Sequence, residues 1–242
     1  MLFAAAFPII LAYDSEVIGT YRQGKWGALT SAPAVASAGM PALRVGIGQV
    51  GFPQTISRIN KTQNKGFELV FSQEKHYDAP LMTITGGVAS VKTKVFQKRS
   101  TDPKVIALIA NYFKAKKFPG KVQKVYLMRG EIDRSPGLDT VYVAESRVEL
   151  GVEKYRAGDF SILLFQSGSG SLTPLIENFY RAPGKDRKDL GLGIEVLAFA
   201  DLDGTGRSEL IIEESNFLGY QIHIYGFNGS RPSRLLTYAN RP

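Results

Sequence analysis

The sequence predicts a mainly β protein with one clear helix, an α+β chain of repeated antiparallel β-modules in a partial-propeller or sandwich-like arrangement. Three observations predict this fold class. Short apolar runs alternate with clusters of Gly, Pro, Asn and Asp along most of the chain, as in proteins of many short strands. One segment, residues 102–117, has a helical period. An acidic turn between two apolar runs occurs twice, 70 residues apart.

Length and composition limit the alternatives. The chain has 242 residues, enough for one large β domain or two small ones. It has no cysteine, so a disulfide framework and a thiolate zinc site are excluded. Its two histidines, His76 and His223, are too few for a histidine-rich metal site.

The N-terminal part is expected to contain strands and loops. Residues 8–28 have the pattern of a hairpin, with a core strand at 9–13. The apolar run 1–13 has the length of a signal-peptide core, but it lacks the basic residues and the cleavage site, and it is too short to span a membrane. Residues 29–42 are expected to form a loop. Further strands are predicted at "LRVGIGQV", "FELVFS", "LMTITGG" and "VASVKTKVFQ".

The helix at 102–117 is predicted by its ends and its apolar stripe. Thr101 or Asp102 is suited to cap its N-terminus, and Pro103 to occupy the first helical position. Three lysines fall in the last turn, where the helix dipole favours positive charge. The apolar stripe has helical spacing and consists of Val105, Ile106, Ile109, Tyr112 and Phe113.

After residue 120 the pattern is almost purely that of strands and turns. The strand-like segments are "KVQKVYLMRG", "TVYVAE", "DFSILLFQ", "GIEVLAFA", "ELIIEE" and "YQIHIYGF". The change of character divides the chain into a β-rich region with one helix, 1–120, and a region of two β-repeats, 121–242. The two form one continuous domain if the helix packs on the repeats.

The repeat is carried by the two acidic turns. When "EIDRSPGLDTVYV" (131–143) is aligned with "DLDGTGRSELIIE" (201–213), acids occupy positions 1, 3 and 9 of both segments and a hydroxyl occupies position 5. An apolar run precedes and follows each copy. This predicts one supersecondary unit used twice.

Calcium prefers six to eight oxygen ligands, and a curled turn with this spacing supplies carboxylate, hydroxyl and carbonyl oxygens. The predicted Ca²⁺ ligands of the second turn are Asp201, Asp203, Thr205, the Arg207 carbonyl and Glu209. A degenerate version of the site consists of Glu131, Asp133, Ser135 and Asp139. The alternative is that these acids accept hydrogen bonds from backbone amides of the turn and hold no metal.

The second turn, in "ADLDGTGRSELII", resembles the D-x-D-G-D-G-x-x-E turn of FG-GAP/VCBS-type repeats, the calcium-turn blades of integrin-like β-propellers and of many exported bacterial proteins. The resemblance covers residues 121–240. It implies a calcium-binding module that is periplasmic, on the cell surface or secreted. Thr205 replaces the third acid of the family turn, and Pro136 replaces a glycine in the first copy. Since a propeller needs four or more blades, two repeats favour a smaller sandwich-like assembly.

Positive charge is concentrated in one segment. Residues 58–124 contain 14 Lys/Arg and 4 Asp/Glu, whereas the whole chain has a formal charge of +8. Such a segment is either a solvated surface or a contact for a polyanion, meaning nucleic acid, an anionic glycan or a membrane surface. The predicted contacts are Lys92, Lys94, Lys98 and Arg99.

Three functions follow from these patterns. The first is a non-enzymatic binding or scaffold module for a protein or glycan ligand, stabilised by Ca²⁺. The second is a polyanion-binding protein that uses segment 58–124. The third is a hydrolase that uses a carboxylate pair such as Asp201 and Glu213, or His223. The alternating pattern of "YQIHIYGF" places His223 on the polar face of a strand, which is typical of a surface residue.

Overall fold

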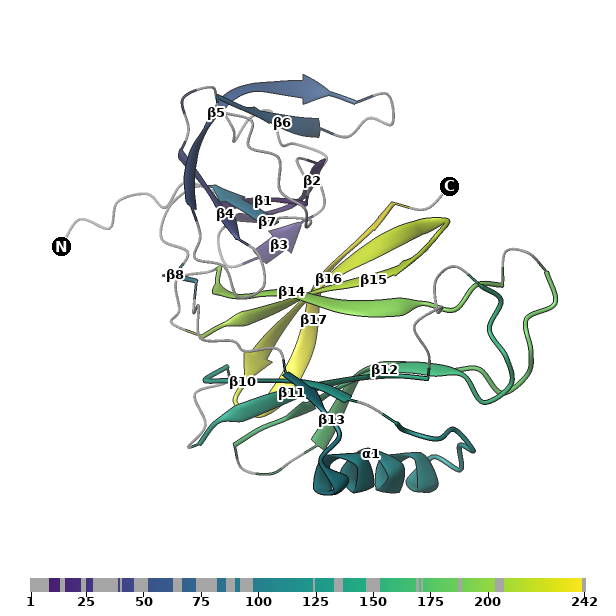
Figure 1. Cartoon of the computed structure of the whole chain (residues 1–242). Helices are drawn as coiled ribbons and strands as arrows, with labels where there is room; N and C mark the ends of the chain where they lie inside the picture. Colours follow the sequence, from purple (N-terminus) through teal and green to yellow (C-terminus); the bar gives the residue numbers. More distant parts are fainter. Residues whose placement is uncertain are drawn as a thin grey trace.

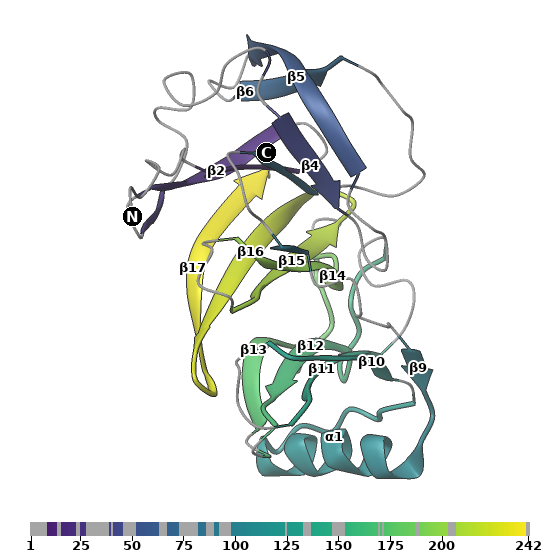
Figure 2. The ribbon, with the colours of Figure 1, turned by 90° about the vertical axis from the view of Figure 1, so that its left-hand side faces the viewer.

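The structure is a computed structural model of the chain. It describes residues 9–13, 16–22, 25–27, 39, 41–45, 52–62, 67–72, 82–85, 90–91, 98–123, 125–132, 137–146, 153–168, 170, 172–186, 189–202 and 207–240. In these ranges the chain forms three antiparallel sheets and one helix, stacked in four layers (Figures 1 and 2).

The N-terminal sheet has the strand order β1-β7-β4-β5-β6-β2-β3, and β1 also pairs with β2, so that the sheet curls back on itself. The expected hairpin at 8–28 is confirmed, because β1 pairs with β2 and β2 with β3. The strands are β1 (Ile9–Tyr13), β2 (Glu16–Arg22), β3 (Lys25–Gly27), β4 (Pro41–Val45), β5 (Phe52–Lys61), β6 (Phe67–Phe71) and β7 (Met82–Thr85).

The other two sheets have the same plan. Each consists of four consecutive strands in a meander, with one short upstream strand added beside the first. The helix-side sheet contains β9 (Lys98–Ser100), β10 (Val125–Gly130), β11 (Asp139–Glu145), β12 (Phe160–Gln166) and β13 (Leu172–Phe179). The C-terminal sheet contains β8 (Ser90–Val91), β14 (Gly193–Asp201), β15 (Glu209–Asn216), β16 (Gly219–Asn228) and β17 (Arg231–Asn240).

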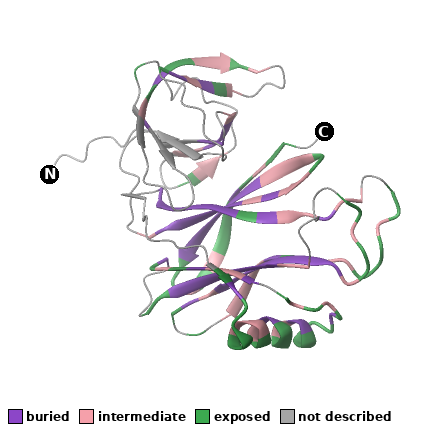
Figure 3. Ribbon diagram, in the orientation of Figure 1, coloured by how far each residue is buried: buried purple, intermediate pink, exposed green. Residues whose placement is uncertain are grey.

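The C-terminal sheet lies between the other two sheets, so both of its faces are buried (Figure 3). On one face Ile211 and Ile224 pack with Ile18 of the N-terminal sheet. On the other face Leu210 and Tyr225 belong to a core shared with the helix-side sheet.

The helix α1 (Pro103–Ala115) is the fourth layer and covers the outer face of the helix-side sheet. The Asp102 side chain caps it by accepting a hydrogen bond from the Lys104 amide at 2.9 Å, as predicted. Phe113 packs edge-on against Phe160, with 4.6 Å between ring centroids. In the described ranges no helix is long and apolar enough to cross a membrane.

The prediction of a mainly β protein with one helix is therefore confirmed. Segments on both sides of residue 120 share the two meander sheets, since β8 and β9 join them and α1 packs on one of them. The sequence patterns missed β5, β13 and β17. Each of these strands buries only one of its described side chains. A strand with a single buried residue needs little alternation of apolar and polar residues, so its sequence carries a weak strand pattern.

Candidate functional site

The two acidic turns occupy equivalent places in the two meanders. The first joins β10 to β11 and the second joins β14 to β15. Gly130 pairs with Asp139, and Ala200 pairs with Glu209. In each hairpin the acid at position 9 therefore lies opposite the residue that precedes the turn, so the sequence alignment of the turns corresponds to a structural equivalence.

The acid at position 9 accepts the same backbone hydrogen bond in both turns. Asp139 Oδ2 lies 2.7 Å from the Ile132 amide nitrogen, and Glu209 Oε2 lies 2.6 Å from that of Leu202. Asp139 Oδ1 also accepts from the Gly168 amide at 2.9 Å. Asp139 and Glu209 are 0% and 3% exposed. At position 9 the acids therefore do what the metal-free alternative requires, because they satisfy backbone donors of a buried turn.

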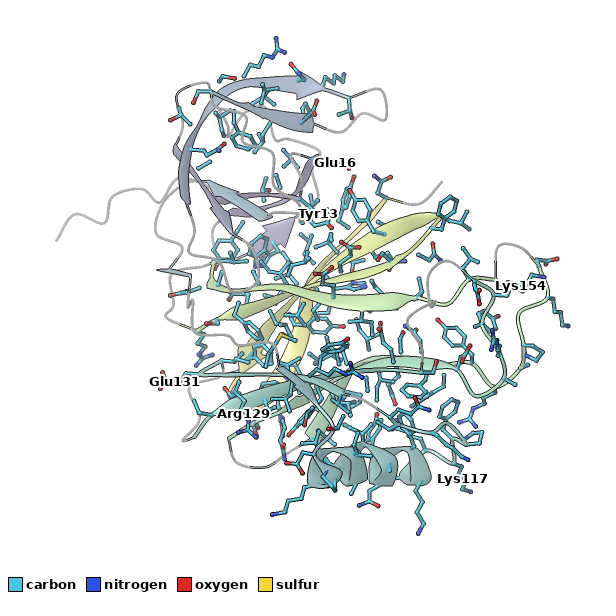
Figure 4. All side chains as sticks on the ribbon, in the orientation of Figure 1. Tyr13, Glu16, Lys117, Arg129, Glu131 and Lys154 are labelled. Carbon is cyan, nitrogen blue, oxygen red and sulfur yellow. The ribbon has the colours of Figure 1, made fainter. Side chains whose placement is uncertain are left out.

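The two turns also contact each other. The Ser208 amide of the second turn donates a hydrogen bond to the Ile132 carbonyl of the first at 3.3 Å. Both turns thus lie at the same end of the two packed meanders, the end at which Glu131 is labelled in Figure 4.

Position 1 distinguishes the two turns. Asp201, the last residue of β14, is 6% exposed, whereas Glu131 is exposed. The base of the second turn therefore holds two buried carboxylates, Asp201 and Glu209. Burying ionised carboxylates is unfavourable unless hydrogen bonds or a cation offset the loss of hydration. This donor set fits a hard cation better in the second turn than in the first.

The remaining predicted ligands of the turns lie outside the described residues, and they are Asp133, Ser135, Asp203 and Thr205. Arg207 is described, and its guanidinium donates to the Phe227 carbonyl of β16 at 3.2 Å. Among the described side chains no three His, Asp or Glu lie close enough together to hold a metal. This statement does not extend to residues 203–206, which lie outside the described ranges. The described part of the turn thus contains two buried carboxylates, Asp201 and Glu209.

His223 is buried, so the prediction that it is a surface residue is wrong. It is 1% exposed, because the face of β16 that looks polar in the sequence is covered by the helix-side sheet. Its Nε2 lies 3.0 Å from Glu214 Oε2, and its Nδ1 lies 3.1 Å from Thr237 Oγ1.

These contacts extend into a polar network between the two meander sheets. Asn178 Nδ2 donates to Glu214 Oε1 at 2.6 Å and to Ser161 Oγ at 3.1 Å. The Thr237 hydroxyl, the His223 imidazole and the Glu214 carboxylate follow one another in this network. The same three groups make up a catalytic site in which a base activates a nucleophile. Here the imidazole lies between the sheets with hydrogen-bond partners on both nitrogens, so the network pairs buried polar groups across the sheet interface.

The other hydrolase candidate, the pair Asp201 and Glu213, is not brought together. Glu213 lies opposite Glu195 in the middle of β15 and accepts a hydrogen bond from the Tyr13 hydroxyl. It is four residues along the strand from Glu209, which places it about 14 Å away from the turn at the rise of a strand. The two carboxylates cannot act on one bond.

Sequence reasoning missed a tyrosine–carboxylate junction between the N-terminal and C-terminal sheets. Glu16 of β2 accepts hydrogen bonds from the hydroxyls of Tyr220, at 2.9 Å, and Tyr238, and from the Asn240 amide at 3.2 Å (Figure 4). Burial, opposed by the Asn240 hydrogen bond and aided by Glu16, raises the pKa of Tyr220 to about 12. These residues carry no motif, and the packing of the N-terminal sheet on the C-terminal sheet brings them together.

The basic segment 58–124 is divided between two ends of the molecule. Arg58 and Lys61 lie on β5 of the N-terminal sheet, whereas Lys104 and Lys114 lie on α1 at the opposite end (Figure 1). Of the predicted polyanion contacts, Arg99 on β9 is exposed, Lys98 is described as part of the β9 backbone, and Lys92 and Lys94 lie outside the described residues.

Comparison of the chain with protein-family models, with curated proteins and with solved structures finds no match.

Proposed function

We propose that the chain is a non-enzymatic binding or scaffold module, exported from the cell, in which Ca²⁺ bound by the turn 201–209 stabilises the C-terminal sheet. In this proposal the two face-to-face meanders are repeats of the FG-GAP/VCBS type. The first turn is their metal-free version, held by the hydrogen bonds of Asp139.

The observation that carries the proposal is the burial of Asp201 and Glu209 at the base of one turn. In the first turn the equivalent of Asp201 is Glu131, which is exposed, and the equivalent of Glu209 is Asp139, which is buried and binds two backbone amides. Glu209 also accepts a hydrogen bond from a backbone amide, that of Leu202, so the buried acid at position 1 is the difference between the turns. A cation between the strand ends would offset the repulsion of two buried carboxylates and fix the hairpin.

Thermal unfolding after EDTA treatment, with Ca²⁺ then added back, tests this function. A ligand that binds the folded state alone stabilises it by about 2.7 kcal/mol at one hundred times its Kd. For a chain of this size that corresponds to a rise of the unfolding midpoint by roughly 5–11 °C.

The sequence repeat offers a matched control. Asp203→Asn should abolish the Ca²⁺-dependent rise, whereas Asp133→Asn, at the same position of the first turn, should leave it unchanged. An unchanged midpoint of the wild-type protein in millimolar Ca²⁺ would contradict the proposal, and so would an equal loss in both variants.

A further inference from the structure

One of the two outer layers of the molecule is the helix α1, whose exposed face is positively charged. The outer face of α1 is exposed, and it consists of Lys104, Ala107, Ala110, Asn111 and Lys114. Lys117 and Lys121 follow the C-terminus of the helix and are exposed as well. Residues 101–124 contain six lysines and one acid, Asp102, whose carboxylate caps the helix.

One acid of the neighbouring strand β13 is already paired with a lysine of this layer. Glu177 of β13 forms an ion pair with Lys116 at 2.9 Å and accepts a hydrogen bond from the Tyr112 hydroxyl at 2.5 Å. The other exposed lysines of this layer are therefore not cancelled by Glu177.

The C-terminal end of the helix is fixed in a way that favours an anion. Arg181 donates hydrogen bonds to the carbonyls of Lys116, at 3.0 Å, and Lys117, at 3.1 Å. Its guanidinium thus covers carbonyl groups whose partial negative charge would otherwise repel an anion at this end.

Lys117 itself has a strained backbone. Its φ is 52°, in the left-handed region where helices commonly end with glycine, and it is the non-glycine residue with positive φ among the described residues. A lysine at this position costs backbone strain that glycine would avoid, and residues with such strain cluster at functional sites.

We propose that the outer face of α1 binds the phosphate backbone of duplex DNA, without reading its sequence. An α-helix is about 10–12 Å across and the major groove is about 12 Å wide, so a helix with small residues between its lysines fits the groove. Lys104 and Lys114 are separated by about 15 Å along the helix, which spans about four phosphates of one strand. This surface belongs to a different element from the acidic turns, and the proposal does not depend on Ca²⁺.

Fluorescence anisotropy of a labelled 20-base-pair duplex, titrated in EDTA between 50 and 300 mM NaCl, tests the proposal. Four lysine–phosphate contacts predict that the logarithm of the binding constant falls with the logarithm of the salt concentration with a slope of about −3.6. Lys114→Gln and Lys117→Gly should each reduce that slope by about 0.9. Lys117→Gly also relieves the backbone strain, so its unfolding midpoint should not fall and its loss of binding cannot come from unfolding.

Lys61→Gln is the matched control, because Lys61 is exposed and belongs to the same basic segment but lies at the opposite end of the molecule. It should bind the duplex as the wild type does. A salt-independent binding constant, or equal losses in Lys61→Gln and Lys114→Gln, would overturn the proposal. Binding of a sulfated glycan through these lysines, with no binding of the duplex, would overturn the assignment to DNA.

Discussion

Replacing Asp139 by asparagine should destabilise the protein strongly, although the side chain keeps its size. The two carboxylate oxygens accept one backbone hydrogen bond each, from Ile132 at 2.7 Å and from Gly168 at 2.9 Å. Asparagine has one acceptor oxygen, so one buried amide would face an NH₂ group. Since a hydrogen bond to a charged group contributes about 1.5–3 kcal/mol, losing one bond and weakening the other predicts a loss of about 2–4 kcal/mol.

Urea unfolding and thermal unfolding measure this loss, and the midpoint temperature should fall by roughly 4–16 °C. Asp189→Asn is the control, because the Asp189 carboxylate also accepts two backbone hydrogen bonds, from Lys185 and Asp186, but with one oxygen and in an exposed loop. Asparagine can keep both of those bonds in weaker form through its one oxygen, so the midpoint should fall less than in Asp139→Asn. If Asp139→Asn were no less stable than Asp189→Asn, the account of the closing carboxylate would be refuted.

Three further substitutions test other parts of the structure. Partial desolvation and the charge of Glu213 raise the pKa of Glu195 in the folded protein, so Glu195→Gln should raise the unfolding midpoint at pH 7. That gain should vanish below about pH 4, where the carboxyl is protonated in both states. Phe113→Ala should cost about 3–5 kcal/mol in urea unfolding, because it empties the ring cluster under α1. His223→Leu should destabilise the protein by about 1–3 kcal/mol in urea unfolding, because the buried Glu214 loses a hydrogen-bond partner. Adding Glu214→Leu should restore part of that loss, and additive losses of the two substitutions would contradict their coupling.

Local signals predicted the helix and the acidic turns well, because the residues that define them are close in sequence. Asp102 caps α1 as expected, and the spacing of acids identified two hairpins whose registers agree. The edge strand β17 was missed, because it buries Leu236 alone and its pairing with β16 depends on the rest of the sheet.

The burial of His223 and the division of the basic segment could not be predicted, for a related reason. Alternation in a strand shows which side chains share a face, but it does not show whether a second sheet covers that face. Likewise, the charge count treats 58–124 as one segment, whereas Lys61 and Lys114 belong to layers at opposite ends of the stack.

The junction between the N-terminal and C-terminal sheets has a consequence for how the protein forms during translation. Tyr13 bonds Glu213 and Glu16 bonds Tyr238, across 200 and 222 residues of chain. At ribosomal rates of about 5–20 residues per second, the strands that cover Tyr13 and Ile18 emerge roughly 10–40 s after them. During that interval an apolar sheet face is available to other nascent chains, so the yield of folded protein should depend on chaperones that bind this face until β14–β17 arrive.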